Sequence, residues 1–107
     1  MKKTKILLVS DGGVTKELMR KMYELEPYGA EITLVEDTDM PSMGDITDRM
    51  GLLERKGIDA APSCQAILDH CADQEIIVVH VASINREVIA ASPGLKVAAV
   101  LRGGTEN

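Results

Sequence analysis

Four short apolar runs, separated by segments with helical spacing, constrain the fold of this 107-residue chain more than any other feature. The runs predict strands over residues 5–10, 31–36, 75–81 and 95–101. Each is the length of a strand and far shorter than the ~20 apolar residues that span a bilayer. Because strands alternate with helices along the chain, the sheet is expected to be parallel with right-handed crossovers.

The segments between these strands predict four helices. The first covers residues 14–26 and places Val14, Leu18, Met22 and Leu25 on one face. The second is predicted to be capped by Asp45 and closed by Gly57, the third covers residues 63–72, and Asn85 caps a short fourth. We therefore predict an α/β fold in one domain spanning residues 1–107, a flavodoxin-like three-layer sandwich with a four-stranded parallel sheet.

Composition narrows the possible partners. The net charge of −5 argues against a general nucleic-acid binder, which needs a basic face. No run predicts a membrane span, and the apolar run near the N-terminus is too short for a signal peptide, so we expect a cytoplasmic protein. With no Phe or Trp, the core must be aliphatic.

The two cysteines, Cys64 and Cys71, are predicted to lie in the third helix. Seven residues of α-helix separate their Cα atoms by roughly 10 Å along the axis, beyond the ~7 Å limit for a disulfide. We therefore expect two reduced, buried thiols.

In open parallel sheets, ligands bind at the carboxyl ends of the strands. After the first strand, the sequence Ser10-Asp11-Gly12-Gly13 could bind phosphate through backbone amides. It matches neither the Walker pattern nor GxGxxG, so an ordinary tight turn is favoured. After the second strand, acidic residues invite a metal interpretation, but the register of a calcium loop is absent and a solvated acidic loop with one helix cap is preferred. These residues are Asp37, Asp39, Asp45 and Asp48.

Two further features lie at the same predicted edge. His80 follows the third strand, and contact with a ligand is as plausible as simple packing at the rim. A guanidinium and two glycine amides in the turn Arg102-Gly103-Gly104 would suit a carboxylate or phosphate, although an exposed turn is equally consistent. Zinc is disfavoured because Cys64, Cys71 and the outward-facing His70 cannot supply converging ligands.

The last third of the chain resembles a known family. Residues 84–107 read I-x-x-E-V-I-x-A-x-P-x-L-K-V, then a small apolar strand, then R-G-G-x-x-N. This pattern is similar to the amino-terminal part of D-isomer-specific 2-hydroxyacid dehydrogenases, and to their D-3-phosphoglycerate dehydrogenase branch in particular. The likeness is specific over these residues and weak over the rest of the chain, including the opening KILLVSD.

The resemblance implies a site and its limits. In that family the turn matching Gly103 and Gly104 binds the substrate carboxylate, and the loop matching residues 80–83 contributes a neighbouring contact. The implied substrate-binding residues are therefore His80, Val81, Ala82, Ser83, Gly103 and Gly104, to which we add Arg102 for its charge and position. The family's catalytic arginine, glutamate and histidine and its NAD-binding GxGxxG correspond to nothing in this chain, so we predict no catalytic, cofactor-binding or metal-binding residue.

We accordingly expect a substrate-binding half-domain of an NAD-dependent dehydrogenase, without its Rossmann domain and without the carboxy-terminal segment that completes the fold. Alone it would be inactive, its partner a small 2-hydroxy or 2-oxo acid. An uncovered sheet edge predicts a homodimer. The alternative is a self-standing flavodoxin-like or receiver-type binding module, although a receiver would have paired acidic residues after strand one and an aspartate after strand three. A flavin binder is disfavoured by the scarcity of aromatic residues.

Overall fold

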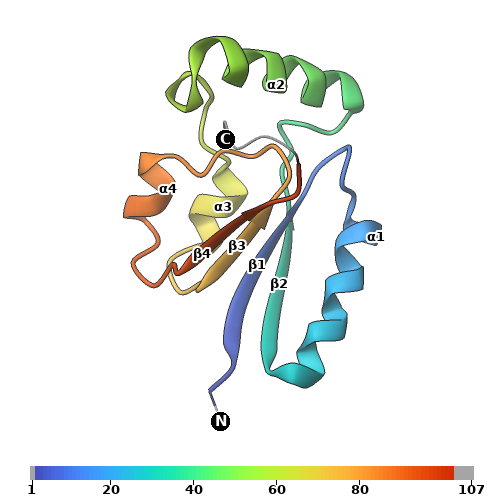
Figure 1. Ribbon diagram of the computed structural model, residues 1–107, viewed down its shortest axis with the longest axis vertical. Coiled ribbons are helices and arrows are strands. Elements are labelled where there is room, and N and C mark those ends of the chain that lie inside the picture. The colour runs from blue at the N-terminus through green and yellow to red at the C-terminus, as the bar shows by residue number, and fades with distance from the viewer. Residues whose placement is uncertain (1, 103–107) are drawn as a thin grey trace.

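The computed structural model describes residues 2–102 and contains one sheet of four parallel strands, in the order β2-β1-β3-β4 (Figure 1). The strands are β1 (Thr4–Ser10), β2 (Ala30–Glu36), β3 (Ile76–Val79) and β4 (Val97–Val100). The predicted α/β fold with a four-stranded parallel sheet is therefore confirmed. Strands three and four are shorter than the sequence predicted, so His80 lies just beyond β3 rather than within it.

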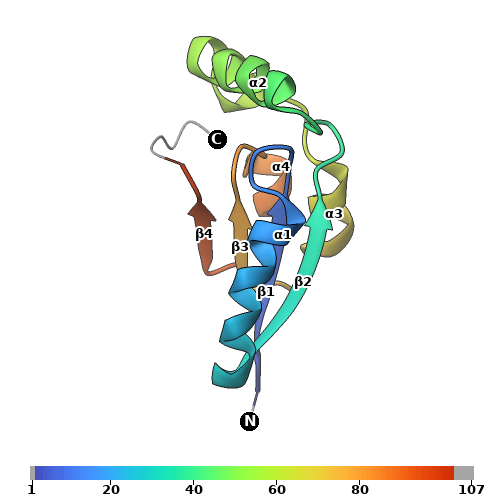
Figure 2. The same ribbon diagram turned by 90° about the vertical axis from the view of Figure 1, so that its right-hand side faces the viewer.

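Helices cover both faces of this sheet. They are α1 (Lys16–Met19), the 3₁₀ helix η1 (Arg20–Tyr28), α2 (Met43–Lys56), the 3₁₀ turn η2 (Ile58–Ala60), α3 (Gln65–His70) and α4 (Arg86–Ala90). In Figure 2, α1 and η1 lie in front of the sheet, and α3 and α4 lie behind it. This arrangement is consistent with a flavodoxin-like sandwich.

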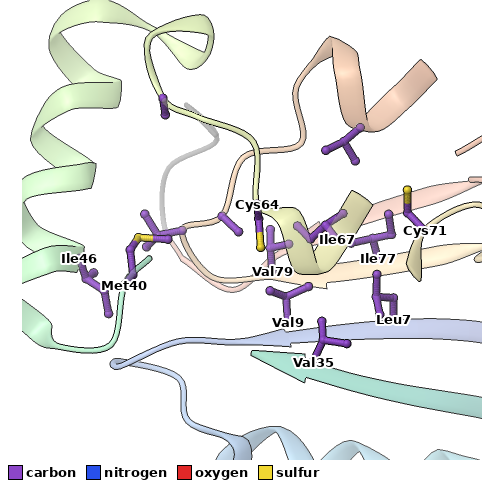
Figure 3. Close-up of a cluster of buried hydrophobic side chains, with 14 of the residues drawn as sticks. Leu7, Val9, Val35, Met40, Ile46, Cys64, Ile67, Cys71, Ile77 and Val79 are labelled. Carbon is purple, nitrogen blue, oxygen red and sulfur yellow. The ribbon is translucent and has the colours of Figure 1, made fainter. Parts of the chain in front are cut away.

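The larger core lies between the sheet and the α3–α4 layer. Leu7 and Val9 of β1 and Ile77 and Val79 of β3 are fully buried and face Ile67 of α3 (Figure 3). Every residue of β3 from Ile77 to Val79 is buried, as a central strand covered on both faces requires. No aromatic side chain takes part among the described residues, so the prediction of an aliphatic core is confirmed.

The smaller core lies under α1. Ile6 and Leu8 of β1 and Val78 of β3 pack there against Met19. The helical layer on this face packs mainly on β1 and β2, and it leaves β4 with exposed apolar side chains.

The first helix differs from its prediction. Thr15 caps a single α-helical turn, and the chain then continues as 3₁₀ helix to Tyr28 instead of forming one α-helix over residues 14–26. Pro27 lies inside the 3₁₀ segment, where its missing N–H removes a helical hydrogen bond. Gly29 ends the segment in the left-handed region (φ 100°), a conformation that glycine adopts without steric cost.

The cap of helix α2 lies three residues earlier than predicted, because it is Ser42 and not Asp45. The Ser42 hydroxyl accepts a hydrogen bond from the Asp45 amide (3.2 Å) and donates one to the Asp45 carboxylate (2.6 Å). Asp45 is thus the acidic residue of the first turn, where its negative charge interacts favourably with the positive end of the helix dipole. Ile46 and Leu53 are buried against the larger core, which holds α2 beyond the carboxyl edge of the sheet (Figure 1).

The cysteines flank α3 instead of lying within it, Cys64 before its first residue and Cys71 after its last. Both are buried and free, as predicted.

Candidate functional site at the carboxyl edge of the sheet

The carboxyl ends of the central strands place the predicted site residues at one edge. Val79 of β3 is in register with Val100 of β4, and the amide of Leu101 donates to the carbonyl of Val79 (2.8 Å). His80 and Arg102 therefore leave neighbouring strands close to the same level. The sequence prediction that these two residues share the edge is supported by this register.

A direct contact joins His80 to Asp11, which leaves the neighbouring strand β1. The imidazole Nδ1 lies 3.0 Å from Asp11 Oδ2 and 3.2 Å from Oδ1. The Asp11 side chain is only 3% exposed and that of His80 is 16% exposed, so water screens the pair poorly.

This contact fixes which ring nitrogen carries the proton. An ionised carboxylate can only accept hydrogen bonds, so His80 Nδ1 must donate to Asp11. In the neutral ring the acceptor nitrogen is then Nε2. Asp11 therefore sets both the tautomer and the orientation of the imidazole.

Asp11 also closes the turn after β1. Its Oδ1 accepts hydrogen bonds from the amides of Gly13 and Val14, both at 2.8 Å. These are the amides that a phosphate group would need, and a carboxylate already occupies them. The favoured interpretation of an ordinary turn is therefore supported. The residues of this turn do not fit the pyrophosphate of a dinucleotide such as NAD.

Gly12 lets this turn pack against the loop that leads into α2. Its amide donates to the carbonyl of Met40 (2.8 Å). A Cβ at Gly12 would lie 2.6 Å from backbone atoms of Pro41 and Ser42. A side chain is therefore excluded at this position by close packing of two backbones and not by a special backbone angle. A shallow cleft of about 370 Å³ opens beside the turn, lined in part by Asp11, Thr15 and Glu36.

Chain comparisons do not assign this site. No family model, no curated protein and no solved structure matches the chain.

The loop after β2 differs from the predicted solvated acidic loop, because Asp37 is buried with only 1% of its surface exposed. Its Oδ1 accepts a hydrogen bond from the Asp39 amide (3.1 Å), whereas Oδ2 has no hydrogen-bond partner among the described residues. Burial raises the pKa of Asp37, and the Asp39 amide, the Arg49 guanidinium and the Cys64 thiol offset this only in part. Burial likewise raises the pKa of Cys64, to about 11, and the charge of Asp37 adds to the effect. Cys64 is therefore an unreactive thiol at neutral pH.

Asp37 should make the protein less stable as the pH rises. Its pKa is higher in the folded chain than the ordinary 3.8, so the folded state holds its proton more tightly than the unfolded state. The stabilisation is complete below the unfolded pKa and is lost as the pH rises through the folded pKa. In urea titrations, the gain in the free energy of unfolding on Asp37→Asn should therefore grow between pH 4 and pH 8.

The comparison with Asp37→Asn removes the contribution of other groups. The pKa values of Asp73 and Glu75 are lowered by hydrogen bonds to Lys5 and Lys96, which gives the opposite pH trend. Both pairs remain in the variant and cancel in the difference. A difference that stays constant with pH would contradict the role of Asp37.

The other predicted site residues have distinct surroundings. Val81, Ala82 and Ser83 are buried as whole residues, with 0%, 2% and 0% of their surface exposed, so the structure opens neither their side chains nor their backbone to a ligand. Within the described part of the chain, the buried hydroxyl of Ser83 has no hydrogen-bond partner. Gly103 and Gly104 lie outside the described residues.

Sequence reasoning missed the role of Asp11, which it treated as part of a simple turn. The Asp-Gly-Gly sequence did carry a usable signal, because aspartate often accepts hydrogen bonds from amides two and three residues ahead. Nothing local connects Asp11 with His80, which lies 69 residues away.

Among residues 2–102, no group of three or more His, Cys, Asp or Glu side chains could hold a metal ion. Nor does this part of the chain contain a helix long and apolar enough to cross a membrane.

Proposed function

We propose that this chain is the substrate-binding half-domain of an NAD-dependent D-2-hydroxyacid dehydrogenase, and that it holds the carboxylate of a small 2-hydroxy or 2-oxo acid. The observation that carries the proposal is the register of β3 and β4, which sets His80 beside the segment that ends in Arg102. A guanidinium suits a planar carboxylate because it can donate two parallel hydrogen bonds.

The pairing of Asp11 with His80 supports the same proposal. A 2-hydroxy or 2-oxo acid carries a hydroxyl or carbonyl oxygen beside its own carboxylate. That oxygen needs a hydrogen-bonding side chain held in one orientation, and Asp11 sets the orientation of His80. The charge of Asp11 is offset by the amides of Gly13 and Val14 and by the imidazole, which limits its repulsion of an acid ligand.

On this proposal the chain binds and orients the acid but does not oxidise it. Hydride transfer needs a bound nicotinamide and an acid–base group against the substrate. The turn after β1 does not fit a dinucleotide, because Asp11 occupies its amides. Cofactor and catalyst would come from a second domain.

Titration of the labelled protein with D-lactate or pyruvate tests the proposal by nuclear magnetic resonance. The backbone signals of residues 80–83 and Arg102 should shift, with a dissociation constant on the order of 1 mM for so small a ligand. Lactamide retains the hydroxyl and lacks the carboxylate, so it should leave these signals unchanged.

Arg102→Ala should weaken lactate binding at least ~10-fold, the usual effect of losing a charge-assisted hydrogen bond. Arg20→Ala, a matched loss of charge on the exposed start of η1, should leave the affinity unchanged. Equal shifts with lactate and lactamide, or equal affinity of the Arg102 variant, would refute the proposal.

A further inference from the structure

Helix α2 belongs to a long excursion of the chain that leaves the sheet and returns to it. β2 ends at Glu36 and α3 begins at Gln65, and residues 38–63 between them, here called the α2 excursion, contribute no strand to the sheet. In Figure 1 this excursion carries α2 across the carboxyl ends of the strands. Its attachment to the rest of the fold therefore controls how open the carboxyl edge is.

The start of the excursion packs on the turn after β1 and beside His80. The amide of Gly12 donates to the carbonyl of Met40 (2.8 Å). A Cβ at Gly13 would lie 3.0 Å from Ile46 Cδ1 of α2 and 3.0 Å from His80 Cε1, so both side chains border this glycine. Opening of the excursion would therefore uncover the edge at which His80 lies.

Asp37 and Cys64 close the base of the excursion, one directly before it and one directly after it. Asp37 is 1% exposed and Cys64 is 4% exposed. Burial is the main cause of the raised pKa of both groups, and each group also shifts the pKa of the other, so the carboxyl and the thiol are neighbours. The two ends of the excursion therefore meet at this pair.

The Asp37 carboxyl is incompletely hydrogen-bonded in this buried position. Its Oδ1 accepts from the Asp39 amide (3.1 Å), whereas Oδ2 has no hydrogen-bond partner among the described residues. A neutral carboxyl tolerates such a position far better than a carboxylate, because burial without partners penalises the charged form most. The docked excursion therefore favours the protonated form of Asp37.

The charged groups around Asp37 do not reverse this preference. Asp39, on the same loop, repels a carboxylate at this position, and Arg49 of α2 attracts it. The neighbouring thiol is only a weak donor. On the turn after β1, Asp11 is itself an acid and is already paired with His80 (3.0 Å). Burial outweighs the attraction of Arg49, and the docked state holds the proton.

We propose that Asp37 is a pH-operated latch, which keeps the α2 excursion docked on the carboxyl edge while its carboxyl is protonated and lets the excursion open when the carboxyl ionises. Opening at the base gives the carboxylate the water that the docked state denies it. Ile46 and Leu53 are buried in the larger core and oppose opening, so the latch changes the open fraction and leaves the sheet folded. The latch does not depend on the identity of any ligand.

The direction of the pH dependence follows from the two states of Asp37. Its pKa lies above the ordinary 3.8 in the docked state and should return to that value when the excursion opens. The open state therefore loses its proton first, and the open fraction should rise by up to ~10-fold per pH unit above the ordinary pKa. The rise should level off above the docked pKa, where both states are ionised.

Hydrogen exchange of the full chain, followed by mass spectrometry between about pH 4 and pH 8, tests the latch. After correction for the intrinsic pH dependence of exchange, the protection of α2 should be lower than that of β1 and β3. It should also fall by up to ~10-fold per pH unit and then level off. Equal protection of α2 and β3 would mean that only global unfolding exposes Asp37. That result, or a protection of α2 that stays constant with pH, would overturn the proposal.

Three substitutions assign the effect to Asp37. Asp37→Asn keeps the shape of a protonated carboxyl and cannot ionise, so the protection of α2 should become independent of pH. Arg49→Gln removes the positive charge that favours the carboxylate in the docked state, so the fall in protection should extend to higher pH. Asp48→Asn, a matched loss of a carboxylate from the exposed side of α2, should leave the profile unchanged. A fall that survives in Asp37→Asn, or a profile that Arg49→Gln does not move, would contradict the latch.

The two cysteines give a second readout without any substitution. Both are buried and free, and Cys71 lies after α3, away from the base of the excursion. Dithiodipyridine labels a thiol only when it becomes exposed, and mass spectrometry of the peptides assigns the label to each cysteine. Exposed thiols share one dependence of reactivity on pH, so the ratio of Cys64 to Cys71 labelling reports the opening. This ratio should rise with pH in the wild type and stay constant in Asp37→Asn; a constant ratio in the wild type would overturn the proposal.

Discussion

Replacing Gly12 with alanine is expected to lower the free energy of unfolding by about 3 kcal/mol, the upper end of the usual cost of overpacking. The added Cβ would stand 2.6 Å from backbone atoms of Pro41 and Ser42, which cannot rotate away as a side chain would. The turn after β1 and the loop before α2 would have to separate, and the bond from the Gly12 amide to Met40 would lengthen or break. Urea denaturation followed by circular dichroism measures the loss.

Gly44→Ala is the matched control for this prediction. Gly44 lies in the first turn of α2, and a Cβ there would meet only the Ser42 hydroxyl at 3.7 Å, an ordinary contact. Since alanine favours helix over glycine by roughly 1 kcal/mol in a helix interior, this variant should be as stable as the wild type or more so. Equal loss of stability in both variants would show that the close approach at Gly12 has no special cost.

Replacing Asp11 with alanine is expected to have a comparable effect, about 3 kcal/mol, because it leaves several hydrogen-bond donors without their acceptor at a buried position. The amides of Gly13 and Val14 and the imidazole of His80 all bond to this carboxylate. The variant should also lose affinity for a 2-hydroxy acid if the proposed site is correct, because His80 loses its orientation.

Asp11→Asn separates the two roles of the carboxylate. An asparagine Oδ1 can still accept from Gly13 and Val14, so most of the stability should remain, with a loss of about 1 kcal/mol. Its amide nitrogen replaces Oδ2, the oxygen nearer to His80 Nδ1, and can only donate, which favours Nδ1 as an acceptor with the ring proton on Nε2. Long-range proton–nitrogen correlation spectra of the imidazole report this exchange directly. A ring with the same tautomer in wild type, Asp11→Asn and Asp11→Ala would contradict the assignment of Asp11 as the residue that sets it.

The fold could be predicted from local patterns because its strands and helices depend on neighbouring residues. Strand three reads as continuous apolar sequence because both of its faces are covered, and β3 is indeed buried from Ile77 to Val79. The cap at Asn85 was also predicted correctly, since its side chain accepts from the Val88 amide three residues ahead (3.0 Å).

Helix starts were harder to locate where two capping residues compete. Ser42 and Asp45 are both good cap residues three positions apart, and in the structure each bonds to the other. The type of the first helix was predicted incorrectly over most of its length, because apolar spacing alone does not distinguish an α-helix from a 3₁₀ helix.

The position of the candidate site in the fold was predicted from the sequence, but the contacts between its side chains were not. The sequence indicated that His80 and Arg102 lie at the carboxyl edge, because parallel strands bring their carboxyl ends together. It gave no means of seeing that Asp37 is buried, because an acidic residue in a polar loop is normally exposed.

The sequence by itself determined a parallel α/β sheet with an aliphatic core and the position of a candidate site at one edge, because apolar periodicity and turn residues act over a few positions. Only the tertiary structure decided that Asp11 orients His80 and that Gly12 packs against the loop before α2. These contacts join residues far apart in the chain, and their geometry depends on how strands are ordered and registered. No local pattern encodes that order.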